Sequence, residues 1–388
     1  MFLLRTGVAT NNVVDASQTT HPQKNHCRGS LSWIAASIPI QLQIGGAIRD
    51  KGKSIMKVVI TGGGGFLGSM LCEALLKHGE LTAPSGNRQR IESIVLLDAL
   101  FPSLPLDPRV TRQVCEISDR EAVFDAVGTD ADVAIFHLAS MVSGECELRF
   151  EDALRVNLDG GRNVFDAARA AARTTDELPR VIFASSIACF GGDVIADSFS
   201  DSSKQLPRTT YGMTKTICEL MINDYSRKRF FDGRSARLPT VIVRPGKPNA
   251  AASSWASGMF REPLAGIDCP LPIRRDQRHP MTGYRTVIDS FIALHELPET
   301  LLGGDRAVGL PAHQVTPGLA EQVLAQVAVE RGLKIGKIVD AYDDRIQGIV
   351  NGWATAIDGS RAIKLGLPQP PSVQEIVHQY LEDFGSVT

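Results

Sequence analysis

Four consecutive glycines, Gly62 to Gly65, constrain this chain more than any other feature. They stand between a short β-branched run, residues 56–61, and a segment with apolar residues at helical spacing, residues 66–78. With Gly68 they form the pattern GxxGxxG, in which glycine lets the backbone turn tightly, approach a phosphate closely and pack a helix on a sheet. The start of such a helix offers free amides and a partial positive charge. The pattern therefore predicts a strand, a glycine turn and a helix that bind a dinucleotide.

A second strand is predicted at residues 93–98 and ends in an acid, Asp98. A carboxylate at this strand end accepts both hydroxyls of an adenosine ribose and repels a 2′-phosphate, so Asp98 favours NAD over NADP. The alternative is that Asp98 only caps a loop, because the connection over residues 79–92 is longer than usual. Further strands are predicted at residues 132–138 and 180–186, with long Ala-rich helical stretches between them. This alternation predicts an α/β protein with a parallel, doubly wound sheet and helices on both faces.

Composition excludes several classes of function. The 388 residues carry 41 Lys and Arg against 43 Asp and Glu, whereas nucleic-acid binders normally show a large basic excess. The seven cysteines are scattered without a CxxC pair, and the eight histidines show no metal-binding spacing, so we expect reduced thiols and no metal. The apolar segment at residues 31–48 is too polar for a membrane span. We therefore expect no nucleic acid, no membrane and no metal as partners.

Residues 1–55 differ from the rest of the chain. They lack helical or strand periodicity and are rich in Asn, Gln, Ser, Thr and Gly, whereas regular elements begin at Met56. We expect residues 1–55 to be a disordered or non-native extension. The alternative is a mitochondrial presequence, because acids are scarce there and Arg5, Arg28 and Arg49 are present, but no continuous basic amphipathic helix emerges. A cytoplasmic location is accordingly favoured over a mitochondrial one.

Three polar residues indicate the chemistry. The strand at residues 180–186 ends in Ser185 and Ser186, and a Tyr-x-x-x-Lys follows at Tyr211 and Lys215. Positions i and i+4 share a helix face, so the phenol and the ammonium would point at one pocket. A nearby cation favours the phenolate and lowers the tyrosine pKa, which makes the phenol a proton-transfer group near neutral pH. The tyrosine motif alone is common, but together with the serines and the glycine pattern it is specific.

From Met56 to about Pro245, these motifs resemble the extended short-chain dehydrogenase/reductases, the NAD-dependent epimerase/dehydratase family. The resemblance implies a Rossmann fold in which Tyr211 exchanges a proton with the substrate hydroxyl and Ser186 hydrogen-bonds the same oxygen. Lys215 would hold the nicotinamide ribose and lower the Tyr211 pKa. Ser185 is the competing candidate for the serine role. His137 is expected to shape the core rather than to catalyse.

The resemblance also implies an NAD site. It comprises the glycine turn and the start of its helix, the acid of the second strand, an acid with an apolar neighbour at the adenine, the segment after the following strand, an asparagine, the catalytic pair and a proline. The implied residues are Gly62, Gly65, Phe66, Leu67, Gly68, Asp98, Glu116, Ile117, Leu138, Ala139, Asn157, Tyr211, Lys215 and Pro245. Asp119 is a less favoured alternative to Glu116 and Ile117.

Departures from the family pattern bear on the reaction. Phe190 stands where the family often has a tyrosine, and the motifs contain no further acid or base group of the kind that epimerases and dehydratases need. Segments such as residues 246–249 and 260–263 most resemble enzymes that oxidise the 2-hydroxyl of a four-carbon sugar acid with NAD. The substrate-binding residues implied are Ser186, Lys247, Asn249, Ser253 and Arg278, while Arg274 and Arg275 are expected to belong mostly to the surface.

Residues 56–245 are therefore predicted to form the NAD-binding Rossmann domain with the catalytic residues, and residues 246–388 a smaller mixed lobe that binds substrate, with helices at 319–331 and 372–384. The predicted function is NAD-dependent oxidation of a small sugar acid. The alternative is a nucleotide-sugar epimerase that keeps NAD bound. The intact Ser186, Tyr211 and Lys215 argue against a silent NAD-binding protein. The resemblance implies a homodimer that pairs through the helix at residues 210–231.

Overall fold

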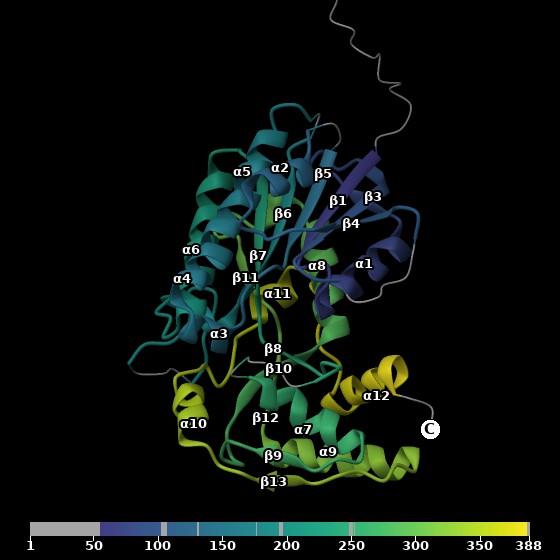
Figure 1. The fold of residues 1–388 in the computed structure, drawn as a ribbon, viewed down its shortest axis with the longest axis vertical. Coiled ribbons are helices and arrows are strands. Elements are labelled where there is room, and N and C mark those ends of the chain that lie inside the picture. The colour runs from purple at the N-terminus through teal and green to yellow at the C-terminus, as the bar shows by residue number, and fades with distance from the viewer. Residues whose placement is uncertain are drawn as a thin grey trace, which may run out of the picture. The chain divides into compact units, whose positions relative to one another are not determined.

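An eight-stranded sheet forms the centre of the part of the chain that is predicted to bind a dinucleotide (Figure 1). The computed structural model describes residues 55–101, 107–129, 132–175, 177–193, 197–247, 251 and 253–385. The predicted extension at residues 1–55 lies outside the described residues except for Ile55, and the predicted substrate residue Asn249 lies outside them too. The strands of the sheet are β1 (Ile55–Thr61), β2 (Glu80–Thr82), β3 (Arg88–Asp98), β4 (Val110–Val114), β5 (Asp132–His137), β6 (Arg180–Ser186), β7 (Asp232–Leu238) and β11 (Ala307–Gly309).

The sheet follows the order β11-β7-β6-β5-β1-β3-β2, and β4 also pairs with β3. Every pairing is parallel except that of the short β2, which forms an antiparallel hairpin with the first part of β3. The strand order reverses on either side of β1, so the loops after β1 and β5 separate and leave a crevice at their carboxyl ends. The predicted parallel, doubly wound sheet is confirmed.

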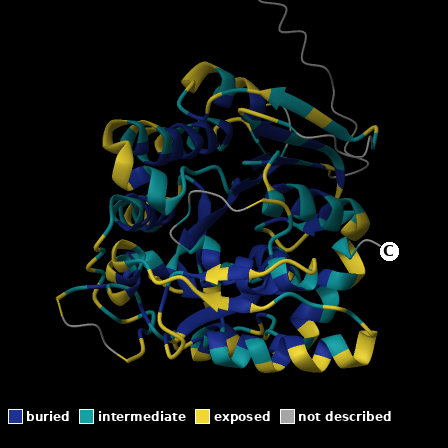
Figure 2. Cartoon of the chain, turned by 60° about the horizontal axis from the view of Figure 1, so that its bottom comes forward, coloured by how far each residue is buried: buried dark blue, intermediate teal, exposed yellow. Residues whose placement is uncertain are grey.

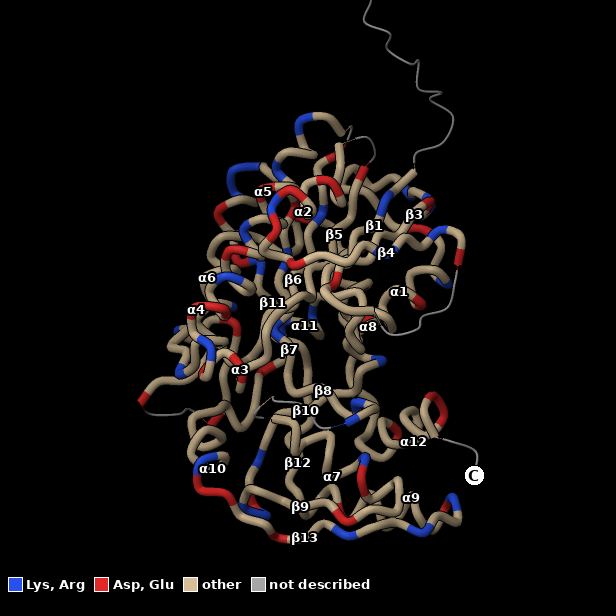
Figure 3. The backbone as a smooth tube through the Cα atoms, in the orientation of Figure 1, with Lys and Arg blue, Asp and Glu red and all other residues tan. Residues whose placement is uncertain are grey.

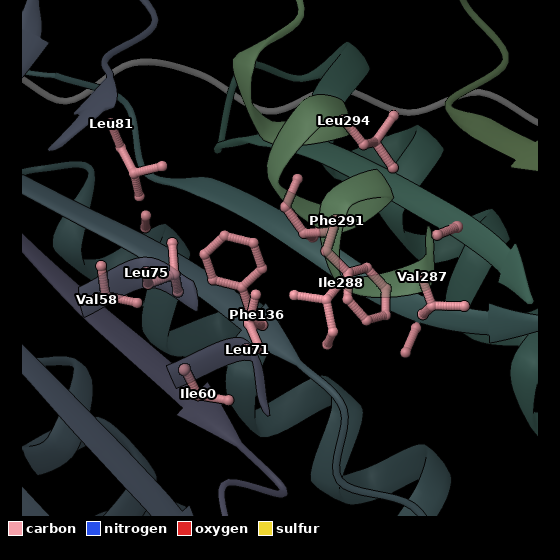
Figure 4. Packing of buried hydrophobic residues seen from close by; sticks show 14 of the residues in the cluster. Val58, Ile60, Leu71, Leu75, Leu81, Phe136, Val287, Ile288, Phe291 and Leu294 are labelled. Carbon is pink, nitrogen blue, oxygen red and sulfur yellow. The ribbon is translucent and has the colours of Figure 1, made fainter. Parts of the chain in front are cut away.

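Helices cover both faces of this sheet. One face carries α1 (Phe66–His78) and α8 (Tyr284–Glu296), and the other carries α2 (Arg120–Val127), α5 (Gly160–Ala171) and α6 (Thr210–Arg227). Alternate residues of one strand face opposite cores: Val58 and Ile60 pack with α1 and α8 (Figure 4), whereas Val59 packs with α2 and α5. All three are fully buried, which explains the continuous apolar run of β1. Figure 2 shows this pattern as dark blue strands between helices with exposed outer faces.

Shorter elements complete the face of α6 and the edge at β11. Between β5 and α5 lie α3 (Ser143–Leu148), α4 (Phe150–Ala153) and a π-helical segment (Leu154–Asp159), while α11 (Ser360–Lys364) packs on β11. Two short 3-10 turns follow β6 and α8, at Ile187–Cys189 and Glu299–Leu301. Charges of both signs are interspersed along the outer helices (Figure 3), in line with the near-zero net charge.

A second layer lies beyond the carboxyl ends of the main strands (Figure 1). It has its own apolar core, built mainly from the three-stranded sheet β12-β10-β8, the strand pair β13-β9 and their helices. Its elements are β8 (Thr240–Ile242), α7 (Ser254–Leu264), β9 (Cys269–Leu271), β10 (His279–Gly283), β12 (His313–Val315), α9 (Pro317–Arg331), β13 (Ile338–Asp340), α10 (Asp344–Asn351) and α12 (Val373–Phe384).

The chain passes between the two layers more than once after residue 245. β10 of the second layer leads directly into α8, which packs on the main sheet, and β11 joins that sheet before β12 returns to the second layer. The described residues from Ile55 onward accordingly form one compact unit. The boundary predicted at residue 245 therefore stays a proposal about function.

Three sequence-based boundaries shift for local reasons. The strand predicted at residues 93–98 begins at Arg88, because the long connection before it folds into the β2–β3 hairpin. The helix predicted at residues 210–231 ends at Arg227, since β7 begins at Asp232. The sequence after Arg237 predicts one strand that ends at Arg244, but Pro239 separates β7 from β8, which ends at Ile242, because proline lacks the amide that a continuous strand would use. These shifts leave the predicted order of elements unchanged.

Within the described part of the chain, no helix is long and apolar enough to cross a membrane. In the same residues, no group of three His, Cys, Asp or Glu side chains gathers in a way that would hold a metal ion. The six cysteines that the structure describes are free thiols.

Candidate active site

The glycine turn joins β1 to α1 with the backbone closely packed on itself. Gly62 has a φ of +74°, which favours glycine, and its amide donates to the Leu97 carbonyl at 2.8 Å. A Cβ on Gly62 would lie 2.8 Å from the Ala139 nitrogen, and one on Gly68 would lie 2.1 Å from the Gly62 oxygen. Side chains at these two positions would therefore push α1 and the segment after β5 off the turn.

A cavity of about 480 Å³ opens at the carboxyl ends of the main strands. It is lined on one side by the turn and the start of α1, next by the ends of β5 and β6 and by α6, and on the far side by the second layer. The predicted residues that line it are Gly62, Gly65, Phe66, Leu67, Gly68, Leu138, Ser186, Tyr211, Lys215 and Ser253, together with the competing candidate Ser185. The structure thus brings together the glycine turn, the serine and the Tyr-x-x-x-Lys pair, which lie far apart in the sequence.

The two serines at the end of β6 make different contacts. The Ser185 hydroxyl donates to the Glu219 carboxylate at 2.5 Å. The same carboxylate accepts hydrogen bonds from the Gln205 side-chain amide and from the Arg237 guanidinium. Ser185, Glu219 and Arg237 are all buried, so they form a structural network, which borders the cavity at Ser185. Ser186 instead hydrogen-bonds the Tyr211 hydroxyl. The contacts favour Ser186 over Ser185 for the catalytic role.

Tyr211 and Lys215 lie on the cavity side of α6, but their electrostatics differ from the expectation. Burial raises the pKa of Tyr211 to about 12, although its hydrogen bond with Ser186 acts in the opposite direction. Burial likewise lowers the pKa of Lys215 to about 8. The Lys215 ammonium donates to the Ala184 carbonyl at 2.8 Å and lies 5.3 Å from the Tyr211 ring centroid. In the protein by itself, burial thus sets the direction of the Tyr211 pKa, and the lowered tyrosine pKa remains a proposal for the complex.

Two further predicted positions shape the segment after β5. His137 is buried, hydrogen-bonds the Thr61 hydroxyl at 2.7 Å and stacks on Phe183. Burial lowers its pKa to about 3, so it is a neutral core residue. The side-chain Oδ1 of Asn157 accepts a hydrogen bond from the Met141 backbone amide at 2.7 Å, and its Nδ2 donates to the Met141 backbone carbonyl at 3.3 Å. Asn157 thereby holds this segment beside the cavity without lining it among the described residues.

The residues predicted around the adenosine lie outside the cavity, on the side of β3 and β4. Asp98 accepts the Gly64 amide at 3.0 Å, so its carboxylate sits directly against the glycine turn. Glu116 is exposed and forms an ion pair with Arg155 at 3.1 Å. Ile117 is buried against Gly160. Asp119 caps α2 by accepting the Ala122 amide, which gives the less favoured alternative a structural role.

The arginine that lines the cavity is not one of the cations predicted to bind the substrate. Arg244 lines the cavity, whereas Lys247 and Arg278 are exposed and do not line it among the described residues. Arg274 pairs with Asp276 and Arg275 with Glu321 and Asp340, as expected of surface residues. Pro245 follows Arg244 without lining the cavity in the described part of the chain.

Arg244 keeps its charge available. Its guanidinium donates to the Lys247 carbonyl at 2.9 Å, and no described carboxylate forms an ion pair with it. Burial and the neighbouring Arg261 lower its pKa, but an arginine remains charged. Among the described residues that line the cavity, there are two basic residues, Lys215 and Arg244, but no Asp or Glu. The cavity therefore carries positive charge that suits an anionic ligand.

Sequence reasoning missed Thr240, Arg244, His279 and Trp353 as lining residues. Arg244 stood out only as the end of a strand, and a count of cations near the following loop would have included it. Thr240 and His279 meet because β8 pairs with β10 across almost forty residues of chain, for which no local signal exists.

The residues around the turn fit a dinucleotide. Gly65, which precedes α1, has no side chain to cap the helix, and the first turn contains no acid. Phe66, Leu67 and Gly68 line the cavity, so the amides of this turn are placed toward an anion. Asp98 lies against this turn and Lys215 lines the cavity, and the binding of ribose hydroxyls by these two residues stays a prediction.

Comparisons with known proteins bear on the family and the fold of the chain. Residues 58–299 match the NAD dependent epimerase/dehydratase family. The D-erythronate dehydrogenase of Cupriavidus necator is 38% identical over 330 residues, which cover 85% of this chain and 99% of that protein. That of Haemophilus influenzae is 36% identical over 329 residues, which cover 84% and 99%. The crystal structure of a nucleoside-diphosphate-sugar epimerase from Agrobacterium tumefaciens matches with a TM-score of 0.75 at 35% identity, covering 86% of this chain and 96% of that one. The family resemblance predicted from the motifs is confirmed.

Proposed function

The chain belongs to the NAD-dependent epimerase/dehydratase family, and on that premise we propose that it oxidises the 2-hydroxyl of a small sugar acid with NAD. The substrate that the relatives favour is D-erythronate, which would yield 2-dehydro-D-erythronate. One observation supports an acid substrate most directly: the described lining of the cavity contains Arg244 and Lys215 but no carboxylate. A substrate carboxylate would find in Arg244 a partly buried guanidinium with free donors.

In this proposal the chain's own residues handle one proton. The Tyr211 oxygen accepts the proton of the substrate hydroxyl, and Ser186, already hydrogen-bonded to Tyr211, holds the same oxygen in place. Bound NAD would supply the acceptor for the hydride that leaves the substrate carbon. Because burial raises the Tyr211 pKa to about 12, the phenolate needs a cation, and the Lys215 ammonium 5.3 Å from the ring is the group placed to provide it.

The cofactor half of the proposal rests on the glycine turn and on Asp98. The uncapped start of α1 would receive the pyrophosphate, and Asp98 would accept the ribose hydroxyls, which selects NAD over NADP. Residues 56–245 thus supply the cofactor and catalytic groups, while residues 246–388 contribute Ser253, His279 and Trp353 to the substrate end. A cytoplasmic location remains part of the proposal.

We also propose that two copies pair through the face of α6. Leu148 on α3, Phe150 on α4 and Leu220 on α6 are large apolar side chains that stay half or more exposed, and α3 and α4 both contact α6. A homodimer would cover them. A charge at Leu220, as in Leu220→Glu, is expected to convert dimer to monomer in analytical ultracentrifugation, and an unchanged mass would refute this pairing.

The experiment that tests the function follows NADH absorbance when the purified protein meets NAD and a sugar acid. We expect NADH with D-erythronate. The Tyr211→Phe variant should bind NAD as the unchanged protein does but lose about 10²- to 10⁴-fold in kcat, because the phenol is the proton acceptor. Retained turnover in that variant would overturn the role given to Tyr211.

The alternative is a nucleotide-sugar epimerase with tightly held NAD, and the name of the Agrobacterium tumefaciens relative favours it. An epimerase regenerates its NAD in each cycle, so it releases no NADH. Interconversion of a UDP-sugar, together with silence toward every sugar acid, would establish this alternative and refute the dehydrogenase.

A further inference from the structure

A buried imidazole holds a threonine hydroxyl at the substrate end of the cavity. His279 on β10 is 2% exposed, and its Nε2 lies 2.6 Å from the Oγ1 of Thr240 on β8. Both residues line the cavity, and β8 pairs in parallel with β10, so the contact rests on two neighbouring strands. Neither residue takes part in the proton transfer proposed above.

The imidazole is fixed by aromatic rings rather than by polar groups. Its ring centroid lies 5.6 Å from that of Trp255 and 5.2 Å from that of Trp353. Its Nδ1 is buried and has no hydrogen-bond partner among the described residues. Burial lowers the pKa of His279 to about 3, so the ring is neutral. A neutral imidazole whose Nδ1 has no hydrogen-bond partner among the described residues cannot relay a proton. The polar contact of His279 in the described structure is to Thr240.

This contact gives the Thr240 hydroxyl a direction. A hydroxyl has one proton and two lone pairs, and His279 uses one of these sites in either tautomer. The other sites remain available, because Thr240 is only partly buried and its neighbours Leu238, Pro239 and Val241 line the cavity with few polar atoms. A ligand hydroxyl placed there regains a hydrogen bond that a methylene group cannot make.

We propose that Thr240, oriented by His279, hydrogen-bonds a substrate hydroxyl beyond the reacting carbon and so selects polyhydroxylated acids over deoxy acids. The proposal rests on the proposed function. Arg244, four residues after Thr240, would take the carboxylate, Ser186 and Tyr211 the reacting hydroxyl, and Thr240 the distal hydroxyl. Three such contacts fix the substrate's orientation, whereas two leave it free to rotate. Thr240 is thus a specificity-determining residue, and His279 is a positioning residue that acts through it.

The test compares D-erythronate with D-2-hydroxybutyrate, which keeps the carboxylate and the 2-hydroxyl but lacks the distal hydroxyls. The unchanged protein is expected to prefer D-erythronate by about 10- to 100-fold in kcat/KM. Thr240→Val keeps the side-chain shape and removes the hydroxyl, so it should lose that preference through D-erythronate alone. Thr240→Ser, which keeps a hydroxyl, should retain most of it. Thr111→Val, at an exposed position of β4 remote from the cavity, is the matched control and should change neither substrate.

His279 is tested through its dependence on Thr240. His279→Phe should reduce the preference in the unchanged background but add nothing in the Thr240→Val background, because it acts through that hydroxyl. A merely structural histidine would lower kcat/KM for both acids equally in either background.

Several outcomes would overturn the proposal: equal rates for the two acids in the unchanged protein, an equal loss for both acids in Thr240→Val, or a full preference in that variant. Should Thr240→Val fail to fold, the preference of the unchanged protein and the result with Thr240→Ser still decide. An unchanged protein that forms no NADH from either acid refutes the proposed function itself. That failure is therefore distinguishable from loss of selectivity in an active enzyme.

Discussion

Ser185 and Ser186 are neighbours, but replacing them separately by alanine should affect different properties. Ser186→Ala should lower kcat, whereas Ser185→Ala should lower the stability of the fold. Ser186→Ala removes the hydroxyl that contacts Tyr211 at the cavity. Loss of one donor to a reacting oxygen typically lowers kcat by about 10²- to 10³-fold. Ser185→Ala instead removes a donor to the buried Glu219. Loss of a buried hydrogen bond to a charged group costs about 1 to 3 kcal/mol in the free energy of unfolding.

The stability change converts into a measurable shift. Unfolding entropy near 2.1 cal/mol/K per residue, over the roughly 330 residues of the folded unit, gives a fall in Tm of about 1 to 4 °C for Ser185→Ala. Its kcat should stay within about threefold of the unchanged value, since Glu219 keeps its contacts with Gln205 and Arg237. Ser186→Ala should have nearly the same Tm as the unchanged protein, because the main local loss is one hydrogen bond, which the Ala188 amide donates to the Ser186 hydroxyl.

The assay is NADH formation from D-erythronate together with calorimetric melting of both variants. A large loss of kcat in Ser185→Ala with an active Ser186→Ala would exchange the two roles and refute the reasoning from contacts. Equal losses in both variants would show that the network beneath β6 and the cavity act as one unit.

Three further predictions concern charged residues. Asp98→Ser removes the carboxylate beside the glycine turn, so the ratio of kcat/KM with NADP to that with NAD should rise at least about tenfold, and an unchanged ratio would assign Asp98 to the turn alone. Lys215→Met should abolish turnover yet leave the protein at least as stable at pH 7. Because the pKa of Lys215 in the folded protein, about 8, lies below the usual 10.5, the unchanged protein should gain stability between about pH 8 and 10.5 in denaturant unfolding. The variant should show no such gain, and an equal gain in both proteins would contradict this prediction. Arg237→Met leaves the buried Glu219 without its cation and should cost about 3 to 5 kcal/mol in urea unfolding, whereas the exposed Arg227→Met should cost about 1 kcal/mol or less, and similar costs for both would argue against a buried network.

Much of the nucleotide-binding half could be predicted because its signals are local. The boundaries of α1 and β6 agree with the sequence pattern, since apolar period, glycine turn and helix start lie within a few residues of one another. Parallel strands buried on both faces give continuous apolar runs, which is why the doubly wound sheet was predictable. The motif residues then meet at the carboxyl ends of the strands as a consequence of that topology.

Tertiary structure decided what the motifs left open. Successive residues of a strand point to opposite faces, so Ser185 and Ser186 make different contacts, but only the position of Glu219 on α6 shows that Ser185 binds it. The burial that raises the Tyr211 pKa depends on how the elements around the cavity pack, which no spacing reveals.

By itself, the sequence predicted the sheet, the glycine turn and the candidate catalytic residues, because the signal of each motif lies within a few neighbouring residues. Only the tertiary structure decided that Arg244 is the cavity's second cation and that Thr240 and His279 meet beside Trp353. These contacts come from strand pairing and packing between segments far apart in the sequence. Their geometry is set by the whole second layer, and this is where substrate selection is expected to lie.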